Sequence, residues 1–145
     1  MAMMRILLVS LLLLAAPPAH AQTARFEVGQ VWSLQPPMDP AARIWIGRIE
    51  DNGQTIHISL WGQPVETTGP LSSPLTAGHL PISAEALGSS VDRVVEEMPP
   101  ADLPFEEGYA DWSNARGGVF TISVADIVVV MVEMIAAQQS PAEKN

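Results

Sequence analysis

The sequence predicts a small α+β domain, in which an antiparallel sheet is packed by two or three helices. Asn52-Gly53 separates two apolar-rich runs, as in a β-hairpin with a two-residue turn. Serine N-caps precede apolar stripes of helical period in two later segments. Without an export signal of 21 residues, 124 of the 145 residues remain, which suits one domain with a single core.

The first 21 residues predict an export signal. Arg5 gives a positive start, an apolar run covers 6–16, and Ala19-His20-Ala21 fits the small-x-small pattern at which such signals are cleaved. The apolar run is shorter than the ~20 residues that span a bilayer. We therefore expect a periplasmic or secreted protein, cleaved after Ala21, with a signal peptide over 1–21, a single α+β domain over 22–137 and a disordered C-terminal tail over 138–145.

The predicted sheet is centred on the hairpin 43–61, preceded by a strand near 30–34 that ends before Pro36-Pro37. The turn places Arg48 opposite His57. One face of the hairpin is then apolar and belongs to the core: Trp45, Gly47, Ile49, Ile56, Ile58 and Leu60. The other face is mixed, and either carries a helix or stays open: Ile44, Ile46, Arg48, Glu50, Thr55, His57, Ser59 and Trp61.

Residues 62–81 are rich in Gly, Pro, Ser and Thr without a period, which predicts a long surface loop. Ser83 then has the position of an N-cap, and the apolar stripe after it predicts a helix over 84–97, packed on the sheet and ended by Pro99-Pro100.

Phe105, Tyr109 and Trp112 recur at helical spacing and predict a short helix over 105–115 that covers an edge of the sheet. A further strand is predicted at 118–122. Ser123 then caps a helix over 124–137, whose apolar residues extend almost all round, as in a helix buried on most sides.

Composition limits the classes of partner. Arg5 is the only charged residue of the signal, so the mature chain has 6 basic and 16 acidic residues and a charge of −10. This charge disfavours nucleic acid and anionic membranes, and no membrane span is expected. It permits a basic protein partner or a small cationic ligand, or it serves solubility alone. With no cysteine, the chain has no disulfide, thiol nucleophile or thiolate metal ligand.

Four stretches resemble a family of small bacterial secreted or periplasmic proteins, many without an assigned activity. They are GQVWSL at 29–34, IHISLWG at 56–62, HLPISAEAL at 79–87, and EGYADW with GGVFTISVADIV within 107–128. The resemblance implies relatedness over nearly all of the mature chain, but it implies no catalytic residue, cofactor or ligand. Trp61 and the valine-rich last helix depart from the family pattern.

The side chains that remain favour a non-enzymatic module that binds a protein or a small ligand. No G-x-S-x-G or H-E-x-x-H motif occurs, and no catalytic residue, metal site or cofactor is predicted. The loop 62–81 and five residues are the candidate binding site: Arg48, His57, Ser59, Trp61 and His79. An acidic inhibitor or an immunity-type protein belongs to this class.

The alternative is a small hydrolase or metal-dependent enzyme centred on His57 and His79. A fold that brings both histidines together with Glu50 or Glu85 would supply a two-histidine, one-carboxylate metal site. The third interpretation is structural: each histidine is partly buried and hydrogen-bonded to a neighbouring group.

Overall fold

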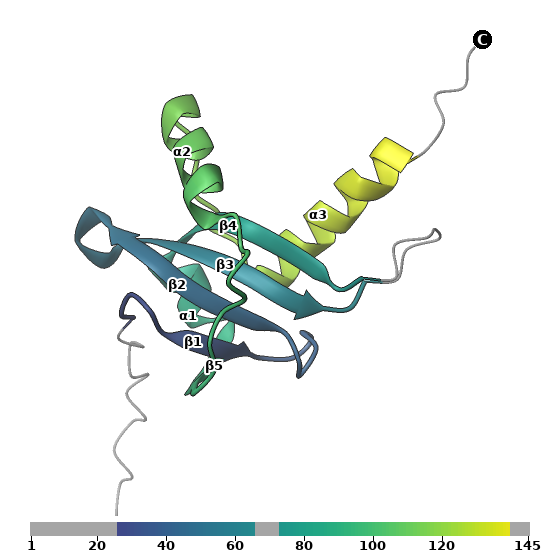
Figure 1. Cartoon of the computed structure of the whole chain (residues 1–145), viewed down its shortest axis with the longest axis horizontal. Helices are drawn as coiled ribbons and strands as arrows, with labels where there is room; N and C mark the ends of the chain where they lie inside the picture. Colours follow the sequence, from purple (N-terminus) through teal and green to yellow (C-terminus); the bar gives the residue numbers. More distant parts are fainter. Residues whose placement is uncertain (1–25, 66–72, 140–145) are drawn as a thin grey trace, which may run out of the picture.

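The computed structural model describes residues 26–65 and 73–139, which form a five-stranded antiparallel sheet and three helices (Figure 1). The strand order is β4-β3-β2-β1-β5. This confirms the predicted fold class. The strands are β1 Val31–Leu34, β2 Arg43–Glu50, β3 Thr55–Gln63, β4 Leu75–Ser83 and β5 Val91–Val95, and the helices are α1 Ala84–Gly88, α2 Phe105–Ala115 and α3 Val124–Gln139.

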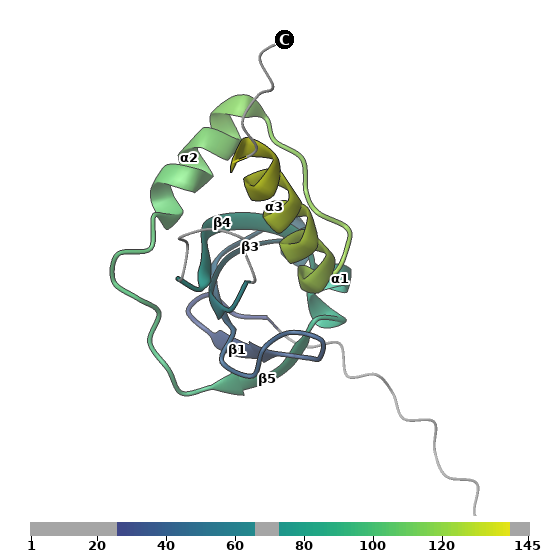
Figure 2. The ribbon, with the colours of Figure 1, turned by 90° about the vertical axis from the view of Figure 1, so that its right-hand side faces the viewer.

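The strands curl around a core that α1 and α3 help to close, while α2 lies outside the curl next to β4 (Figure 2). The largest fully buried side chains are aliphatic and come from β2, β3, β4, α1 and α3. Burial of such residues is the main source of stability for a chain without disulfides. They include Ile44, Ile46, Ile56, Ile58, Leu60, Ile82, Leu87 and Ile127.

The hairpin at Asn52-Gly53 is confirmed, but its connection covers the four residues 51–54 rather than two, because Asp51 also has a positive φ, of 52°, and the ladder ends at the pair Glu50–Thr55. Asn52 and Gly53 have φ values of 55° and 89°, and the Gln54 N–H donates to the Asp51 carbonyl at 3.2 Å. The predicted pairing next to the turn is also confirmed, because Arg48 lies opposite His57. Glu50 therefore lies on the same face of the sheet as these two side chains.

The predicted faces are wrong on the other side of Gly47. The register shifts between Ile46 and Arg48, so Gly47 is the extra residue of a β-bulge and Trp45 lies opposite Ser59. Ile44 and Ile46 therefore point into the core, where both are fully buried, and Trp45 joins the mixed face. Side-chain alternation predicts that all even-numbered residues of a strand share one face and all odd-numbered residues the other. The bulge at Gly47 exchanges these two faces once.

Residues 62–63 of the surface loop predicted over 62–81 belong to β3, and 66–72 lie outside the described residues. The last part, 75–81, belongs to strand β4. Gly78 and Pro81 give this segment the composition of a loop. However, β4 is an edge strand, and the Pro81 carbonyl turns away from β3 to accept the Phe120 N–H at 2.9 Å. Proline is tolerated at this position because its missing N–H would not have served the β3 ladder.

The helix predicted over 84–97 is wrong beyond Gly88. Ser83 is the N-cap, and its Oγ accepts the Ala86 N–H at 3.2 Å, but the helix ends after five residues. Val91–Val95 forms β5 and pairs with β1. Valine is β-branched and favours a strand, and this pairing gives β1 a partner on its second side.

The strand predicted at 118–122 is reduced to one bridge. Phe120 pairs in parallel with Ile82, and the Phe120 carbonyl accepts the Ser83 N–H at 2.8 Å. No further pair forms among the described residues, because the chain turns into the Ser123 cap of α3 directly afterwards.

Helices α2 and α3 confirm the predictions over 105–115 and 124–137, and α2 packs on edge strand β4 and its neighbour β3. Burial of α3 on most sides is wrong. Val124 and Ile127 are fully buried, whereas three apolar side chains are exposed on the other side: Val129, Val130 and Met134.

Helix α3 runs two residues into the predicted tail. The remaining tail residues, 140–145, and the predicted signal peptide, 1–21, lie outside the described residues. Within the described part of the chain, no helix has both the length and the apolarity that crossing a bilayer requires.

Candidate functional site

Helix α2 approaches the mixed face of the sheet closely because glycines lie at the contacts. A Cβ at Gly108 of α2 would come within 2.7 Å of the His79 Cβ on β4. A Cβ at Gly47 would overlap the Phe105 ring at the start of the helix. These absent side chains let α2 lie directly on the histidines of β3 and β4.

The cluster beneath α2 consists of Glu50, His57, His79 and Tyr109, and is called the histidine cluster below. His57 Nδ1 lies 2.9 Å from His79 Nε2, and His57 Nε2 lies 3.3 Å from Glu50 Oε2. The Tyr109 hydroxyl donates to Glu50 Oε1 at 2.6 Å. One hydrogen-bonded chain thus joins β2, β3, β4 and α2.

The Glu50 carboxylate at one end of this row of hydrogen bonds determines where the protons lie. A carboxylate only accepts, so His57 Nε2 carries the hydrogen toward Glu50, and neutral His57 Nδ1 accepts the hydrogen of His79 Nε2. Neutral His79 then has a lone pair at Nδ1, for which the described residues provide no hydrogen-bond partner. His79 is only partly buried, so this lone pair is the polar end of the cluster.

The environment keeps both imidazoles neutral. Burial lowers the pKa of His79 to about 4, and the neighbouring His57 adds to this effect. Burial also lowers the pKa of His57, against the opposing influence of Glu50. The hydrogen bond to Glu50 raises the pKa of Tyr109. At neutral pH neither imidazole of the cluster is therefore charged.

Aromatic rings enclose the two imidazoles. The Trp112 ring meets His57 edge-on at a centroid distance of 4.7 Å, and Phe105 meets His79 at 5.5 Å. Arg48 lies over the Tyr109 ring, with its Cζ 3.9 Å from the centroid, and pairs with Glu106 at 3.6 Å. Arg48 therefore connects β2 to α2 by a cation–π contact and an ion pair.

The structure gathers Arg48, His57 and His79 from the predicted site. Ser59 lies next to them, but it is fully buried and its hydroxyl donates to the Gly78 carbonyl at 2.6 Å. Trp61 lies further along the same face, opposite Arg43, and has no ring contact with the other aromatic side chains of the described residues.

The geometry does not support the predicted metal alternative. Glu50 binds Nε2 of His57, whereas His79 binds Nδ1 on the opposite side of the same ring, so the three donors do not converge on one point. Glu85 lies on α1, outside the cluster. Across 26–65 and 73–139, no group of three histidine or carboxylate side chains could hold a metal ion.

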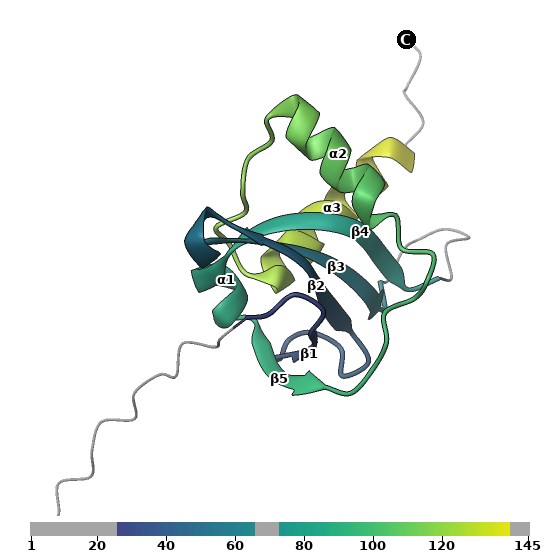
Figure 3. The same cartoon turned by 60° about the vertical axis from the view of Figure 1, so that its left-hand side comes forward.

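An acidic segment joins β5 to α2. Residues 94–115 contain 6 of the 16 acidic residues and no lysine or arginine, and all six acidic side chains are exposed: Glu96, Glu97, Asp102, Glu106, Glu107 and Asp111. Residues 96–104, called the strap below, run from β5 across the sheet to α2 (Figures 1 and 3). Arg43 pairs with Glu97 at 2.9 Å.

The strap and the first turn of α2 enclose an open cavity of about 480 Å³, called the strap cavity. It is lined by Trp45, residues 98–101 and residues 103–107, most of which are apolar. The Trp45 and Phe105 rings meet edge-on at 5.2 Å within this lining. Glu106 and Glu107 supply its carboxylates. This combination of an apolar wall and a few charged groups is typical of ligand sites.

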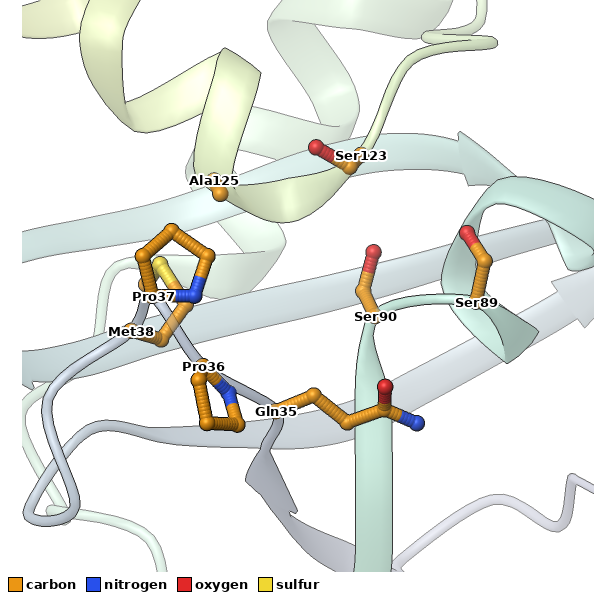
Figure 4. A pocket seen from close by; sticks show the side chains of 8 residues that line it. All are labelled: Gln35, Pro36, Pro37, Met38, Ser89, Ser90, Ser123 and Ala125. Atoms are coloured by element: carbon orange, nitrogen blue, oxygen red, sulfur yellow. The ribbon is translucent and has the colours of Figure 1, made fainter.

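A second cavity, of about 60 Å³, lies between Pro36-Pro37 and the start of α3 (Figure 4). Its polar groups already have partners. The Ser90 hydroxyl donates to the Ala86 carbonyl at 2.7 Å and accepts the Val124 N–H at 3.0 Å, and Ser123 caps α3. We therefore assign this cavity to the packing of α1 against α3.

Comparison with known proteins gives no relative: no family model, curated protein or solved structure matches this chain. The resemblance based on its four sequence stretches stays a prediction.

Sequence reasoning missed the strap cavity and the role of Tyr109. The helical spacing of Phe105, Tyr109 and Trp112 predicts the helix, but it does not predict which residues of the sheet these side chains contact. Glu50 was identified on the mixed face with Arg48 and His57, because the turn defined that part of the register. The cavity depends on the strap, whose prolines give no periodic signal.

Proposed function

We propose that this protein is an exported, non-enzymatic binding module for a basic protein partner, which it contacts through the strap and α2. The strap cavity carries the proposal, because it provides an open apolar depression within the most acidic segment of the chain. Aromatic anchors surrounded by charged groups are the usual composition of a protein-binding hot spot. An acidic inhibitor of a basic enzyme or toxin has this chemistry.

The negative charge of the acidic segment supports a positively charged partner. Among the six exposed carboxylates of the acidic segment, only Glu97 and Glu106 have an arginine partner in the described part of the chain. The remaining four are available to a basic surface, and such complementarity raises association rates and gives specificity. The mature charge of −10 acts in the same direction at longer range.

The test is affinity capture of residues 22–145 from an envelope extract of the source organism, with elution across a salt series. We expect a stoichiometric basic protein that salt releases. The variant Glu106→Gln/Glu107→Gln should lose most of the capture, and the control Glu85→Gln/Glu133→Gln, which removes two exposed charges elsewhere, should retain it. Equal capture by both variants, or none after crosslinking at low salt, would contradict the proposal.

A small hydrolase centred on His57 and His79 is the second candidate, favoured by their 2.9 Å contact and by Glu50 behind His57. A histidine oriented by a carboxylate is a common catalytic arrangement. Against it, the low pKa of His79 makes its free Nδ1 a weak base. Turnover of model esters or phosphoesters by the mature protein, abolished in His79→Gln with the fold intact by circular dichroism, would favour this candidate over the binding module.

A further inference from the structure

We propose that the strap cavity binds the side chain of a lysine or arginine from a polypeptide, with its aliphatic stem on the apolar wall and its cation at Glu107. The inference rests on the proposed function and specifies the chemistry that the cavity recognises. It depends on three properties of the cavity: its size, its apolar wall and its two unpaired polar groups.

The cavity is large enough to admit a lysine or arginine side chain, and its wall is apolar. A cavity of about 480 Å³ lies within the ~300–1,000 Å³ range of ligand pockets. Trp45, Pro99, Leu103 and Phe105 supply flat or branched apolar groups against which a methylene chain packs. Met98 is 88 % exposed, which leaves apolar surface without cover beside the cavity.

The polar groups select a cation. Glu107 lines the cavity and has no ion pair or hydrogen bond among the described residues, whereas Arg48 partly neutralises Glu106. A cation in the cavity therefore meets a free carboxylate, and the nearby Trp45 ring adds a cation–π contact. An anionic ligand would meet both carboxylates unfavourably.

The second unpaired group offers a hydrogen bond to a peptide that carries the cation. The indole N–H of Trp45 donates to no acceptor in the described part of the chain, although the Trp32 and Trp112 indoles both have one. A peptide carbonyl next to the bound side chain provides such an acceptor, and a simple alkylamine does not.

The experiment uses ¹⁵N-labelled residues 22–145, in which four tryptophans give four indole N–H signals. The signal lost in Trp45→Phe identifies Trp45. The probes are N-acetyl-lysine methylamide, its neutral isostere N-acetyl-norleucine methylamide, and n-butylamine. We expect saturable shifts of the Trp45 signal, with the lysine probe binding about fivefold more tightly than the norleucine probe. It should also bind more tightly than butylamine.

The matched variants separate the cavity from general acidity. Glu107→Gln should weaken binding of the lysine probe about threefold, and Glu85→Gln on α1 should leave it unchanged. Both positions are exposed, so neither change threatens the fold. Equal affinity for the lysine and norleucine probes, an unchanged affinity in Glu107→Gln, or butylamine as the tightest probe would overturn the inference.

The outcomes of the two experiments are distinct. Capture of a basic partner without probe binding would leave the proposed function standing and overturn the assignment of the cavity. Probe binding without a captured partner would support the assignment of the cavity and contradict the proposed function.

Discussion

The Tyr109 hydroxyl donates a 2.6 Å hydrogen bond to Glu50, a residue 59 positions away in the chain. Glu50 lies at the end of β2, next to the hairpin turn, and Tyr109 lies in the middle of α2. Glu50 also accepts from His57, so a single carboxylate connects the helix to both strands of the hairpin. Helix α2 is thus held by polar contacts as well as by its aromatic side chains.

Tyr109→Phe should destabilise the protein by about 1–2 kcal/mol, because it removes a hydrogen bond to a charged acceptor and keeps the ring. Urea denaturation of residues 22–145 measures the change in the free energy of unfolding. Ser113→Ala is the control on the same helix, where the exposed side chain should contribute less than about 0.5 kcal/mol. Equal effects at the two positions would show that the bond to Glu50 contributes nothing.

Stability should fall as the pH drops from about 6.5 toward 4. The pKa of His79 is about 4 in the folded protein and that of His57 is also lowered, whereas an unfolded histidine has an ordinary value near 6.5. In this window the unfolded chain binds more protons, so acid favours unfolding, and the stability is fully present above the window. For His79 alone, the lowering of the pKa from 6.5 to about 4, at ~1.4 kcal/mol per pKa unit, gives about 3–4 kcal/mol, and solvent screening of its partly exposed ring reduces this to about 2–3 kcal/mol.

The variant His79→Gln tests whether His79 causes this pH dependence of stability. Urea titrations between about pH 7 and pH 5, above the range in which carboxylates titrate, should give a shallower pH dependence than in the wild type. An unchanged slope would exclude His79 as its source.

Gly47→Ala should cost about 1–3 kcal/mol, because its methyl group overlaps the Phe105 ring and pushes the start of α2 outward. Calorimetry of Gly47→Ala, Phe105→Leu and the double variant tests the contact. The smaller side chain at position 105 should reduce the cost of the alanine. If the two changes are additive, the cost comes from the bulge itself and not from Phe105.

Ser90→Ala should destabilise the protein by about 1–3 kcal/mol. The buried Ser90 hydroxyl accepts the Val124 N–H at the start of α3 and donates to Ala86, so its loss leaves the buried Val124 N–H without a partner. Ser89→Ala is a matched control: Ser89 also donates to the Ala86 carbonyl, but it is exposed. Similar denaturant midpoints for the two variants would contradict the link between α1 and α3.

Local chemistry predicted the elements whose signals are contained in a few neighbouring residues. The Asn52-Gly53 turn and the Ser83 cap are examples, because each depends on contacts within about four positions. The pairing next to the turn followed from the turn itself. This is why Arg48 and His57 were correctly placed on one face before the fold was known.

The errors arose where distant partners decide the structure. Val91–Val95 became a strand because β1 offers a free edge, which a helical stripe of valines does not reveal. Strand β4 contains Gly78 and Pro81 and still forms, because it lies at the edge of the sheet. The contact of His57 with His79 depends on the pairing of β3 with β4, which the loop-like composition of 62–81 does not predict.

The bulge at Gly47 gives β2 two phases, and this limits how the hairpin can change in length. Removal of Gly47 would restore simple alternation and leave Trp45 opposite Ser59 and Ile44 in the core, because only the unpaired residue is lost. A lengthened turn would leave both phases intact. A homologue of this hairpin can therefore vary in length at 51–54 or lack the extra residue of β2. Where that residue is present, it should be small enough to fit under a phenylalanine ring.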